Sequence, residues 1–369
     1  MKILLHMGLS KTGTTSLQSA LFASREQLRK RGIVYPDGGP ARENHKLLTV
    51  LLQPPDSVAR DVKFIFDFDD ARMRRAAQDM WEATKREVER ARPELLILSS
   101  EYLFAKPRAE GFHKLRELLT QLSHDITPIV YFREAAAHFG SRVQQSVKNG
   151  RPFESADGSH LQRETPLIEA AFGKPIVACV ADRDQLLDGD IVTDFLARFV
   201  APAVGAIEIA PVRLNESVSA EVLAIIDRFR RLRYPNHVGT MPEHHSLRVI
   251  LANLECESGR AASPRLRPEV TEAVRRSSSD MLWLRDRYGI EFRGVDYAVI
   301  DGAPFDIDPA RTTIEDLFEV DADVRDALQT AALAEALSSW RQLQRMSRIS
   351  RVVGAAGIGL FAKRRAGKR

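Results

Sequence analysis

Short apolar runs alternate with longer amphipathic segments over roughly the first half of the chain. The runs are four or five residues long and consist mainly of Ile, Leu and Val: Ile3–Met7, Leu95–Ser99, Ile129–Phe132 and Ile176–Val180. Continuous apolar strands are typical of a parallel sheet that is covered on both faces. Their alternation with amphipathic segments predicts β/α units, and hence an α/β fold with a central parallel sheet flanked by helices.

Helical periodicity marks the segments between and after these runs. The first predicted helix begins near Gly13, places Leu17 and Leu21 on one face and ends at Gly32. Further helices are predicted at Ala71–Ala91, Phe112–Leu122, Ala135–Lys148, Ile191–Val200, Ser219–Arg233, Pro268–Tyr288 and Val324–Ser350. We therefore expect an α/β domain over residues 1–300, helical from about 202, and a C-terminal helical extension with a basic tail over 301–369.

The net charge of +4 comes from the end of the chain. The segment Arg341–Arg369 holds nine Lys and Arg and no Asp or Glu, so the rest of the chain carries 4 − 9 = −5. A body of that charge disfavours a general nucleic-acid-binding surface, and no nucleic acid partner is expected.

The cysteines and the first residues indicate a cytoplasmic protein. Cys179 and Cys256 are the two cysteines of the chain, and neither has the spacing of a zinc finger or a disulfide scaffold. The apolar run that follows Lys2 ends at His6, which is too short for a signal peptide. No apolar stretch approaches the roughly 18 residues that a membrane-spanning helix needs.

A small-residue loop follows the first predicted strand and opens the first predicted helix. It reads His6-Met7-Gly8-Leu9-Ser10-Lys11-Thr12-Gly13-Thr14-Thr15-Ser16. Small residues let several backbone N–H groups face one anion, and a helix N-terminus adds positive potential. Hydroxyl groups and a lysine add further donors. The loop therefore predicts a phosphate site formed by Lys11, Thr12, Gly13, Thr14, Thr15 and Ser16.

The position of the lysine distinguishes this loop from a Walker A loop. Walker A has Lys directly after the second Gly, whereas here Thr14 follows Gly13 and Lys11 precedes it. Lys-Thr-Gly-Thr-Thr instead resembles the 5′-phosphosulfate loop of sulfotransferases, in particular the bacterial sulfotransferase-family proteins. The resemblance implies 3′-phosphoadenosine 5′-phosphosulfate (PAPS) as the donor, without a metal.

The same resemblance implies a second phosphate site, made by an Arg after a central strand and a Ser eight residues later. Arg133 follows Ile129–Phe132, and Ser141 lies about 12 Å further along the predicted helix. Softer likenesses are found at Leu96–Glu101, Phe172–Gly173, Asp194–Leu196 and Asn215–Ser219. The resemblance extends over about residues 1–220.

Sulfuryl transfer requires a cation at the leaving oxygen and a base for the acceptor. Lys11 is the candidate cation, since charge develops on the bridging oxygen in the transition state. Three residues remain open as the base: Glu101 at the end of a strand, His45 in a polar loop and His6 beside the phosphate loop. Each also has a structural interpretation, as a cap or ion pair, a loop residue and a core histidine.

The resulting hypothesis is a PAPS-dependent sulfotransferase that acts on a hydroxyl of a carbohydrate or glycolipid. The alternatives are a P-loop nucleotide kinase and a non-catalytic nucleotide-binding protein that kept the fold. We expect the acceptor pocket to involve the loops Pro36–Asn44, Pro54–Asp70 and Gly150–Thr165. In the tail 341–369, Leu343, Met346 and Ile349 recur among arginines, which fits either a helix on the inner membrane face or a solvated terminus.

Overall fold

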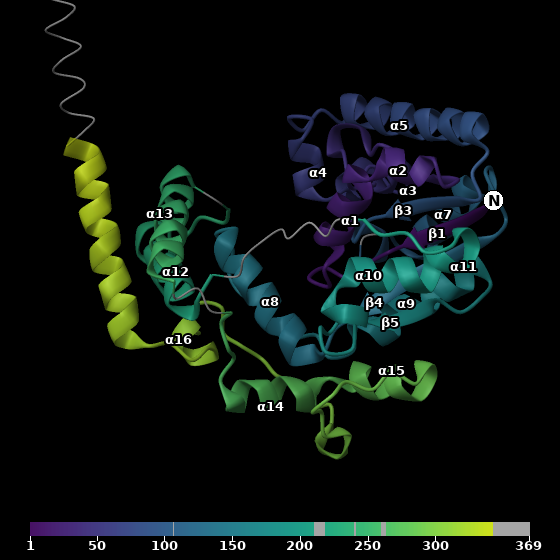
Figure 1. Cartoon of the computed structure of the whole chain (residues 1–369). Helices are drawn as coiled ribbons and strands as arrows, with labels where there is room; N and C mark the ends of the chain where they lie inside the picture. Colours follow the sequence, from purple (N-terminus) through teal and green to yellow (C-terminus); the bar gives the residue numbers. More distant parts are fainter. Residues whose placement is uncertain (106, 210–217, 240, 260–262, 342–369) are drawn as a thin grey trace, which may run out of the picture. The chain divides into compact units, whose positions relative to one another are not determined.

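The computed structural model describes residues 1–105, 107–209, 218–239, 241–259 and 263–341. It confirms the predicted α/β fold with a parallel sheet flanked by helices and a helical C-terminal part (Figure 1). Five strands lie in the order β2-β3-β1-β4-β5, and every neighbouring pair is parallel. Their bounds are β1 Lys2–His6, β2 Ile33–Val34, β3 Leu95–Ser99, β4 Ile126–Phe132 and β5 Val177–Val180. Only β2 was not predicted, because two residues are too few to form a pattern.

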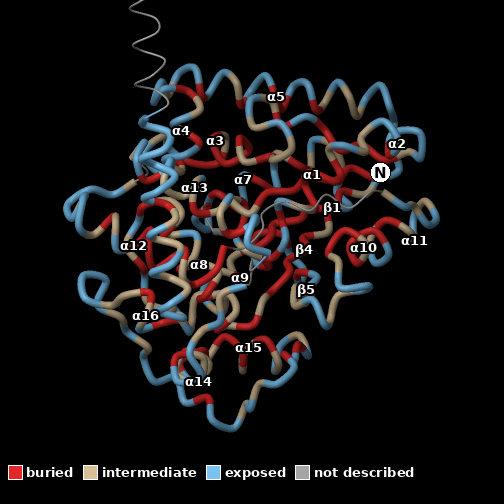
Figure 2. The backbone as a smooth tube through the Cα atoms, turned by 60° about the vertical axis from the view of Figure 1, so that its left-hand side comes forward, coloured by how far each residue is buried: buried red, intermediate tan, exposed pale blue. Residues whose placement is uncertain are grey.

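Alternate residues of the central strands pack into separate cores on the two faces of the sheet. Ile3 and Leu5 of β1 contribute to one cluster together with Val130 of β4. Leu4 and Ile97 belong to the cluster on the other face. Figure 2 shows buried backbone along β1 and β4. Covering both faces explains why these strands are apolar at successive positions.

The helices divide between the two faces. One core contains residues of α1 (Thr14–Ala23), α2 (Arg25–Arg29) and α10 (Ile191–Phe195). The other contains residues of α3 (Leu48–Leu52), α4 (Arg60–Phe64), α5 (Asp70–Ala91), α6 (Tyr102–Ala105), α7 (Ala109–Thr120), α9 (His160–Phe172) and α15 (Ser279–Tyr288). The connection that leaves β1 therefore runs over one face, and the connection from β4 to β5 includes α9 on the other.

Helix α8 has the predicted bounds, Ala135–Lys148, and α5 begins one residue early because the Asp69 side chain accepts from the Arg72 N–H. Two predicted helices are each divided. The first breaks at Ser24 into α1 and α2, and Pro268–Tyr288 breaks at Ser278 into α14 and α15. The remaining described elements are α11 (Ala201–Val204), α12 (Ala220–Arg233), α14 (Pro268–Ser277), α16 (Ile314–Leu317), short 3₁₀ turns at Gly39–Ala41, Pro55–Ser57, Leu187–Gly189 and Tyr297–Val299, and a π turn at Leu196–Val200.

Two of the longer described helices were not predicted, for different reasons. Helix α9 begins inside the expected loop Gly150–Thr165 and contains Pro166, a residue that normally interrupts a helical pattern. Helix α13 (Pro242–Ser258) buries the polar residues His244 and Glu255 beside one leucine, so its sequence shows no apolar stripe.

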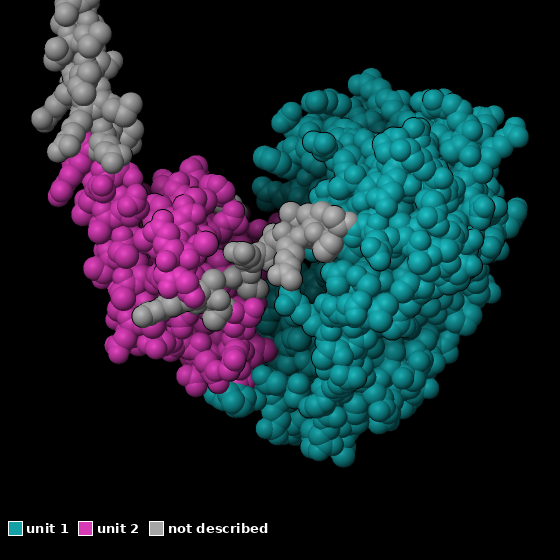
Figure 3. Space-filling model, viewed as in Figure 1, with its two compact units in different colours: residues 1–142, 155–216, 268–306 teal, residues 143–154, 217–267, 307–369 magenta. Residues whose placement is uncertain are grey.

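The chain forms two compact units (Figure 3). Unit 1 comprises residues 1–142, 155–216 and 268–306 and contains the sheet. Unit 2 comprises residues 143–154, 217–267 and 307–369, so the units alternate along the sequence, whereas the expected division lay at residue 300. Among the residues described, no helix is both long and apolar enough to cross a bilayer.

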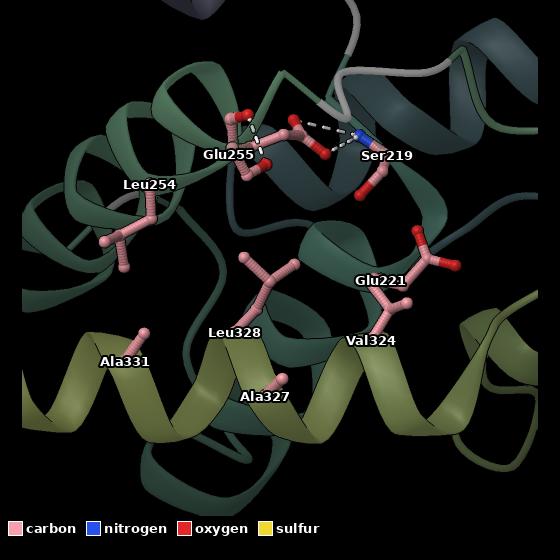
Figure 4. A pocket seen from close by; sticks show the side chains of 9 residues that line it. Ser219, Glu221, Leu254, Glu255, Val324, Ala327, Leu328 and Ala331 are labelled. Carbon is pink, nitrogen blue, oxygen red and sulfur yellow. Dashed lines mark hydrogen bonds between the residues drawn. The ribbon is translucent and has the colours of Figure 1, made fainter.

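Unit 2 contains a small pocket between α12, α13 and the helical residues 322–341 (Figure 4). At the edge of this pocket, both carboxylate oxygens of Glu255 accept from the Ser219 N–H. Its lining consists of Ser219, Glu221, Leu254, Glu255, Ser258, Val324, Ala327, Leu328 and Ala331. None of the predicted site residues lines it.

Candidate functional site

The direction of the strand connections reverses between β1 and β4. From β1 the chain continues to the β2 side of the sheet, and from β4 it continues to the β5 side. In open parallel sheets, ligands bind where the direction of connection reverses in this way. Lys11 lies in the loop after β1, and Arg133 directly follows β4. The fold therefore brings the two predicted cationic residues to the same edge of the sheet, where the connections reverse.

The β1–α1 loop turns sharply at three positions. Gly8, Lys11 and Gly13 have φ values of +44°, +71° and +82°. A Cβ at Gly8 would lie 2.8 Å from the Thr14 Oγ1, so the close approach requires glycine there. Lys11 is the unusual residue, because left-handed backbone costs a side-chain-bearing residue roughly 1–2 kcal/mol. Backbone strain of this kind is concentrated at ligand sites.

The loop hydroxyls divide into two groups. Thr12 and Thr14 are buried, and both hydroxyls donate to the Leu9 carbonyl, at 2.7 and 3.2 Å. They hold the shape of the loop. Thr15 is exposed and Ser16 is half-buried at the start of α1. The first N–H groups of a helix lack intrahelical partners, and no side chain caps this helix at Gly13. These N–H groups, Thr15 and Ser16 can therefore meet an anion.

Arg133 contacts the loop directly. Its Nη1 donates to the Lys11 carbonyl at 2.9 Å, across 122 residues of sequence. Burial and the neighbouring Arg133 charge lower the pKa of Lys11. Burial also lowers the pKa of Arg133, although Asp182 and Glu134 act in the opposite direction. Two partly buried cations thus lie close together, an arrangement that an anion would stabilise.

His138 is a residue of this region that the sequence did not single out. It lies on α8, five residues after Arg133, and forms a hydrogen bond with the Ser10 backbone. Burial and the charges of Arg142 and Arg133 lower its pKa to about 3, so the ring is neutral. The only signal in the sequence was its place on the predicted helix that follows Arg133. It helps to hold the loop against α8.

Ser141 lies on α8 and is half-buried. Within the described chain, no hydrogen bond joins it to Arg133. The predicted pair therefore shares a strand end and the following helix, but the two side chains are not in contact.

Glu101 lies at the end of β3, on the other side of β1 from Arg133. Its Oε2 accepts from the side-chain amides of Asn44, at 3.0 Å, and Gln18, at 3.3 Å. In the part of the chain that is described, Oε1 has no hydrogen bond or ion pair. A carboxylate held at one oxygen by neutral donors retains an oxygen that can accept a proton.

His45 is fully buried, and backbone groups occupy its ring. Nδ1 accepts from the Ser99 N–H at 3.0 Å, and Nε2 donates to the Pro36 carbonyl at 3.0 Å. Burial lowers its pKa to about 4. The geometry gives His45 a structural role, since it attaches the segment before it to the end of β3. It leaves no ring nitrogen for a substrate.

His6, the third candidate base, is also buried. Its Nδ1 lies 2.8 Å from the Ser99 Oγ, and its ring packs edge-on against Tyr131 and Phe195. Burial lowers its pKa to about 3. This is the position of a core histidine that orients the Ser99 hydroxyl.

Glu134 is a second carboxylate at this edge of the sheet that the sequence did not single out. Its two oxygens accept from the N–H groups of Ala136 and Ala137, and Arg275 donates to it at 3.0 Å. A carboxylate at the first turn of a helix stabilises that turn. Glu134 therefore begins α8 and, unlike Glu101, has both oxygens occupied.

Three predicted residues thus follow three adjacent strands. Glu101 follows β3, Lys11 follows β1 and Arg133 follows β4. Neighbouring strands lie about 4.8 Å apart, so β3 and β4 are about 10 Å apart. Lys11 follows β1, the strand between them. This arrangement would have a base on one side of Lys11 and a second anion site on the other.

Among the described residues, no group of three His, Cys, Asp or Glu side chains is arranged to hold a metal ion. Of the softer likenesses, residues 215–217 lie outside the described residues. No family model, curated protein or solved structure matches this chain. The likeness to sulfotransferases therefore rests on the motifs and on the geometry above.

Proposed function

We propose that the protein is a sulfotransferase that moves the sulfuryl group of PAPS to a hydroxyl of a carbohydrate or glycolipid. One observation carries the proposal. Arg133 and Lys11 meet at the sheet edge where the connections of the parallel sheet reverse, through the 2.9 Å hydrogen bond from Arg133 to the Lys11 carbonyl. The α/β fold itself supports many functions, so the proposal depends on this site.

The donor would bind along this edge of the sheet. The N–H groups at the start of α1, with Thr15 and Ser16, would hold the 5′-phosphosulfate. Arg133 now donates to a neutral carbonyl, and the 3′-phosphate would provide a stronger, charged acceptor. Ser141 would add a hydroxyl two turns along α8. The Thr12 and Thr14 hydroxyls would support the loop.

Transfer would proceed by in-line displacement at sulfur. The acceptor oxygen forms a bond to sulfur, its proton passes to Glu101, and the bond between sulfur and the bridging phosphate oxygen breaks. The electron pair of that bond stays on the departing 3′-phosphoadenosine 5′-phosphate (PAP). Lys11 would stabilise the charge on that oxygen, where a cation has most effect. Partial burial strengthens this interaction, since it reduces screening by water.

The position of Lys11 favours PAPS over ATP. In a Walker A loop the lysine belongs to the start of the helix, whereas Lys11 lies before Gly13 in left-handed backbone. Thermal unfolding with PAP, PAPS and ATP tests the difference. We expect PAP and PAPS to raise the melting temperature and ATP to raise it less. Stabilisation by ATP alone would favour a nucleotide kinase.

Radiolabelled PAPS and a panel of saccharides and glycolipids test the reaction itself. We expect label to appear on at least one acceptor with the wild-type chain and not with Lys11→Ala. PAP binding without transfer to any acceptor or to water would favour a non-catalytic nucleotide-binding protein.

We also propose that the C-terminal region reaches an anionic membrane surface, where a glycolipid acceptor would be found. Leu333, Leu337 and Trp340 lie on one face of the helical residues 322–341 and are 60%, 55% and 56% exposed. The sequence of residues 341–369 adds nine basic residues. Residues 342–369 lie outside the described residues. Co-sedimentation with phosphatidylserine vesicles should fall when residues 341–369 are removed. Equal binding by the shortened chain would contradict the proposal.

A further inference from the structure

Two amide side chains hold the carboxylate of Glu101. Asn44 Nδ2 and Gln18 Nε2 both donate to Oε2, at 3.0 and 3.3 Å. Asn44 Nδ2 also donates to Gln18 Oε1 at 3.2 Å, so the three side chains form a closed triangle. They come from α1, from the loop before His45 and from the end of β3, which are far apart in sequence. The triangle is therefore a product of the tertiary structure.

The triangle is attached to the sheet at two places. Gln18 is buried, and its Nε2 also donates to the Ser99 Oγ at 3.2 Å, a hydroxyl that His6 orients from the neighbouring strand. Asn44 precedes His45, whose backbone N–H donates to the Ser99 carbonyl at 3.1 Å. Both amide residues thus have an attachment to the end of β3 in addition to their bonds to Glu101.

Glu101 is bound by neutral amides and differs in this respect from the carboxylates that form ion pairs, such as Glu134. In the described chain, no Lys or Arg pairs with Glu101, and its Oε1 is neither bonded nor enclosed. Glu134, in contrast, has both oxygens occupied and pairs with Arg275. An Arg would engage a carboxylate at both oxygens, whereas the amides fix one oxygen and leave the other. This is the arrangement that a positioned base requires.

We propose that Gln18 and Asn44 are positioning residues, which fix Oε2 of Glu101 so that Oε1 faces the acceptor hydroxyl. This inference rests on the proposed function. The acceptor O–H proton passes to Oε1 as the acceptor oxygen bonds to sulfur and PAP departs with the electron pair of the broken S–O bond. Gln18 also lies one helical turn after Thr14, so α1 links the base to the loop that would hold the donor.

Isosteric variants test the proposal with little change in packing. Asn44→Asp and Gln18→Glu replace the amide that donates to Oε2 by a carboxylate that repels it. The measurement is formation of PAP together with the fate of the label of PAPS, which appears on a saccharide of the panel or, with water as acceptor, as free sulfate. We expect kcat to fall about 10- to 100-fold, because a small error in position has a large effect on proton transfer. The Kd for PAP should stay within about twofold of the wild-type value.

Asn44→Leu and Gln18→Leu remove the amides without adding charge and should also lower kcat with unchanged PAP affinity. Gln121→Glu is the matched control, since it adds the same charge at the end of α7, where Gln121 accepts from Trp81 of α5. Melting temperatures show which variants fold.

The outcomes separate this proposal from the proposed function. Folded variants with wild-type kcat, or with PAP affinity reduced in proportion to kcat, would overturn the positioning role alone. A wild-type chain that does not bind PAP, or binds it and moves label from PAPS neither to an acceptor nor to water, would overturn the transfer reaction and this inference with it.

Discussion

The two sides of the β1–α1 loop hold charge in opposite ways. On the β4 side, Lys11 and Arg133 lie together, and each has a lowered pKa. On the β3 side, Glu101 is held by the neutral amides of Gln18 and Asn44. The first side brings two partly buried cations together, while the second presents one carboxylate with one oxygen available.

The difference matters because each arrangement suits a different partner. Closely placed, partly buried cations are stabilised by an anion, and this is the requirement for a phosphate-bearing donor. A carboxylate that has one oxygen available can accept the proton of a neutral hydroxyl. Changes on the first side should therefore alter donor binding or leaving-group chemistry, and changes on the second should alter acceptor activation alone.

The largest expected effect is that of Lys11→Ala. Loss of the cation at the bridging oxygen should lower kcat for transfer from PAPS by about 10²- to 10³-fold. PAP affinity, measured by calorimetry, should fall much less. Lys30→Ala, an exposed lysine at the end of α2, serves as the control. Equal losses in kcat and affinity would mean that Lys11 only binds the nucleotide.

Glu101→Gln and His45→Gln separate the base from the structural histidine. We expect Glu101→Gln to lower kcat about 100-fold with little change in melting temperature, since the amide keeps an acceptor oxygen for Gln18 and Asn44. His45→Gln should lower the melting temperature by several degrees, because two buried backbone bonds are disturbed. The opposite pattern would make His45 the better candidate for the base.

Arg133→Ala should weaken PAP binding by about 10- to 100-fold, as expected for the loss of a charged hydrogen bond. Calorimetry with PAP and with adenosine 5′-phosphate measures the effect, which should disappear for the ligand without a 3′-phosphate. Arg116→Ala is a matched control, because Arg116 also donates to a backbone carbonyl, that of Ala171 on another helix. Unchanged PAP affinity would remove Arg133 from the second phosphate site.

The smallest of the expected effects is the response of stability to pH, which involves histidines on both sides of the β1–α1 loop. Burial lowers the pKa of His6 and His138 to about 3 and that of His45 to about 4. In the unfolded chain these histidines have the ordinary pKa of about 6.5, whereas in the folded chain they stay neutral down to about pH 4. Between these pH values the unfolded chain therefore binds more protons than the folded chain. The free energy of unfolding should therefore fall over this range. Asp182 and Asp280, whose pKa values burial raises to about 6, act in the opposite direction but are fewer.

Urea unfolding at pH 7 and pH 5 measures this change. His45→Gln should make the dependence on pH shallower, because it removes one of the three protonation sites. A free energy of unfolding that rises between pH 7 and pH 5 would contradict the neutral, buried state of these rings.

Prediction from sequence succeeded where the signal was local. The strand Leu95–Ser99 and the helix Ala135–Lys148 have the predicted bounds, since each carries its own pattern of apolar residues. Helix α13 was missed because it buries polar residues, and β2 because it is too short. His138 was missed because its role depends on a contact with Ser10, which lies 128 residues away.

The sequence by itself determined the α/β class, the loop from Gly8 to Ser16 with its lysine before the glycine, and the place of Arg133 after a strand. These features depend on neighbouring residues. The tertiary structure alone decided which strands are adjacent, and hence that Glu101, Lys11 and Arg133 follow three neighbouring strands. It also distinguished Glu101 from His45, because burial and hydrogen bonds depend on segments that meet only when the chain folds.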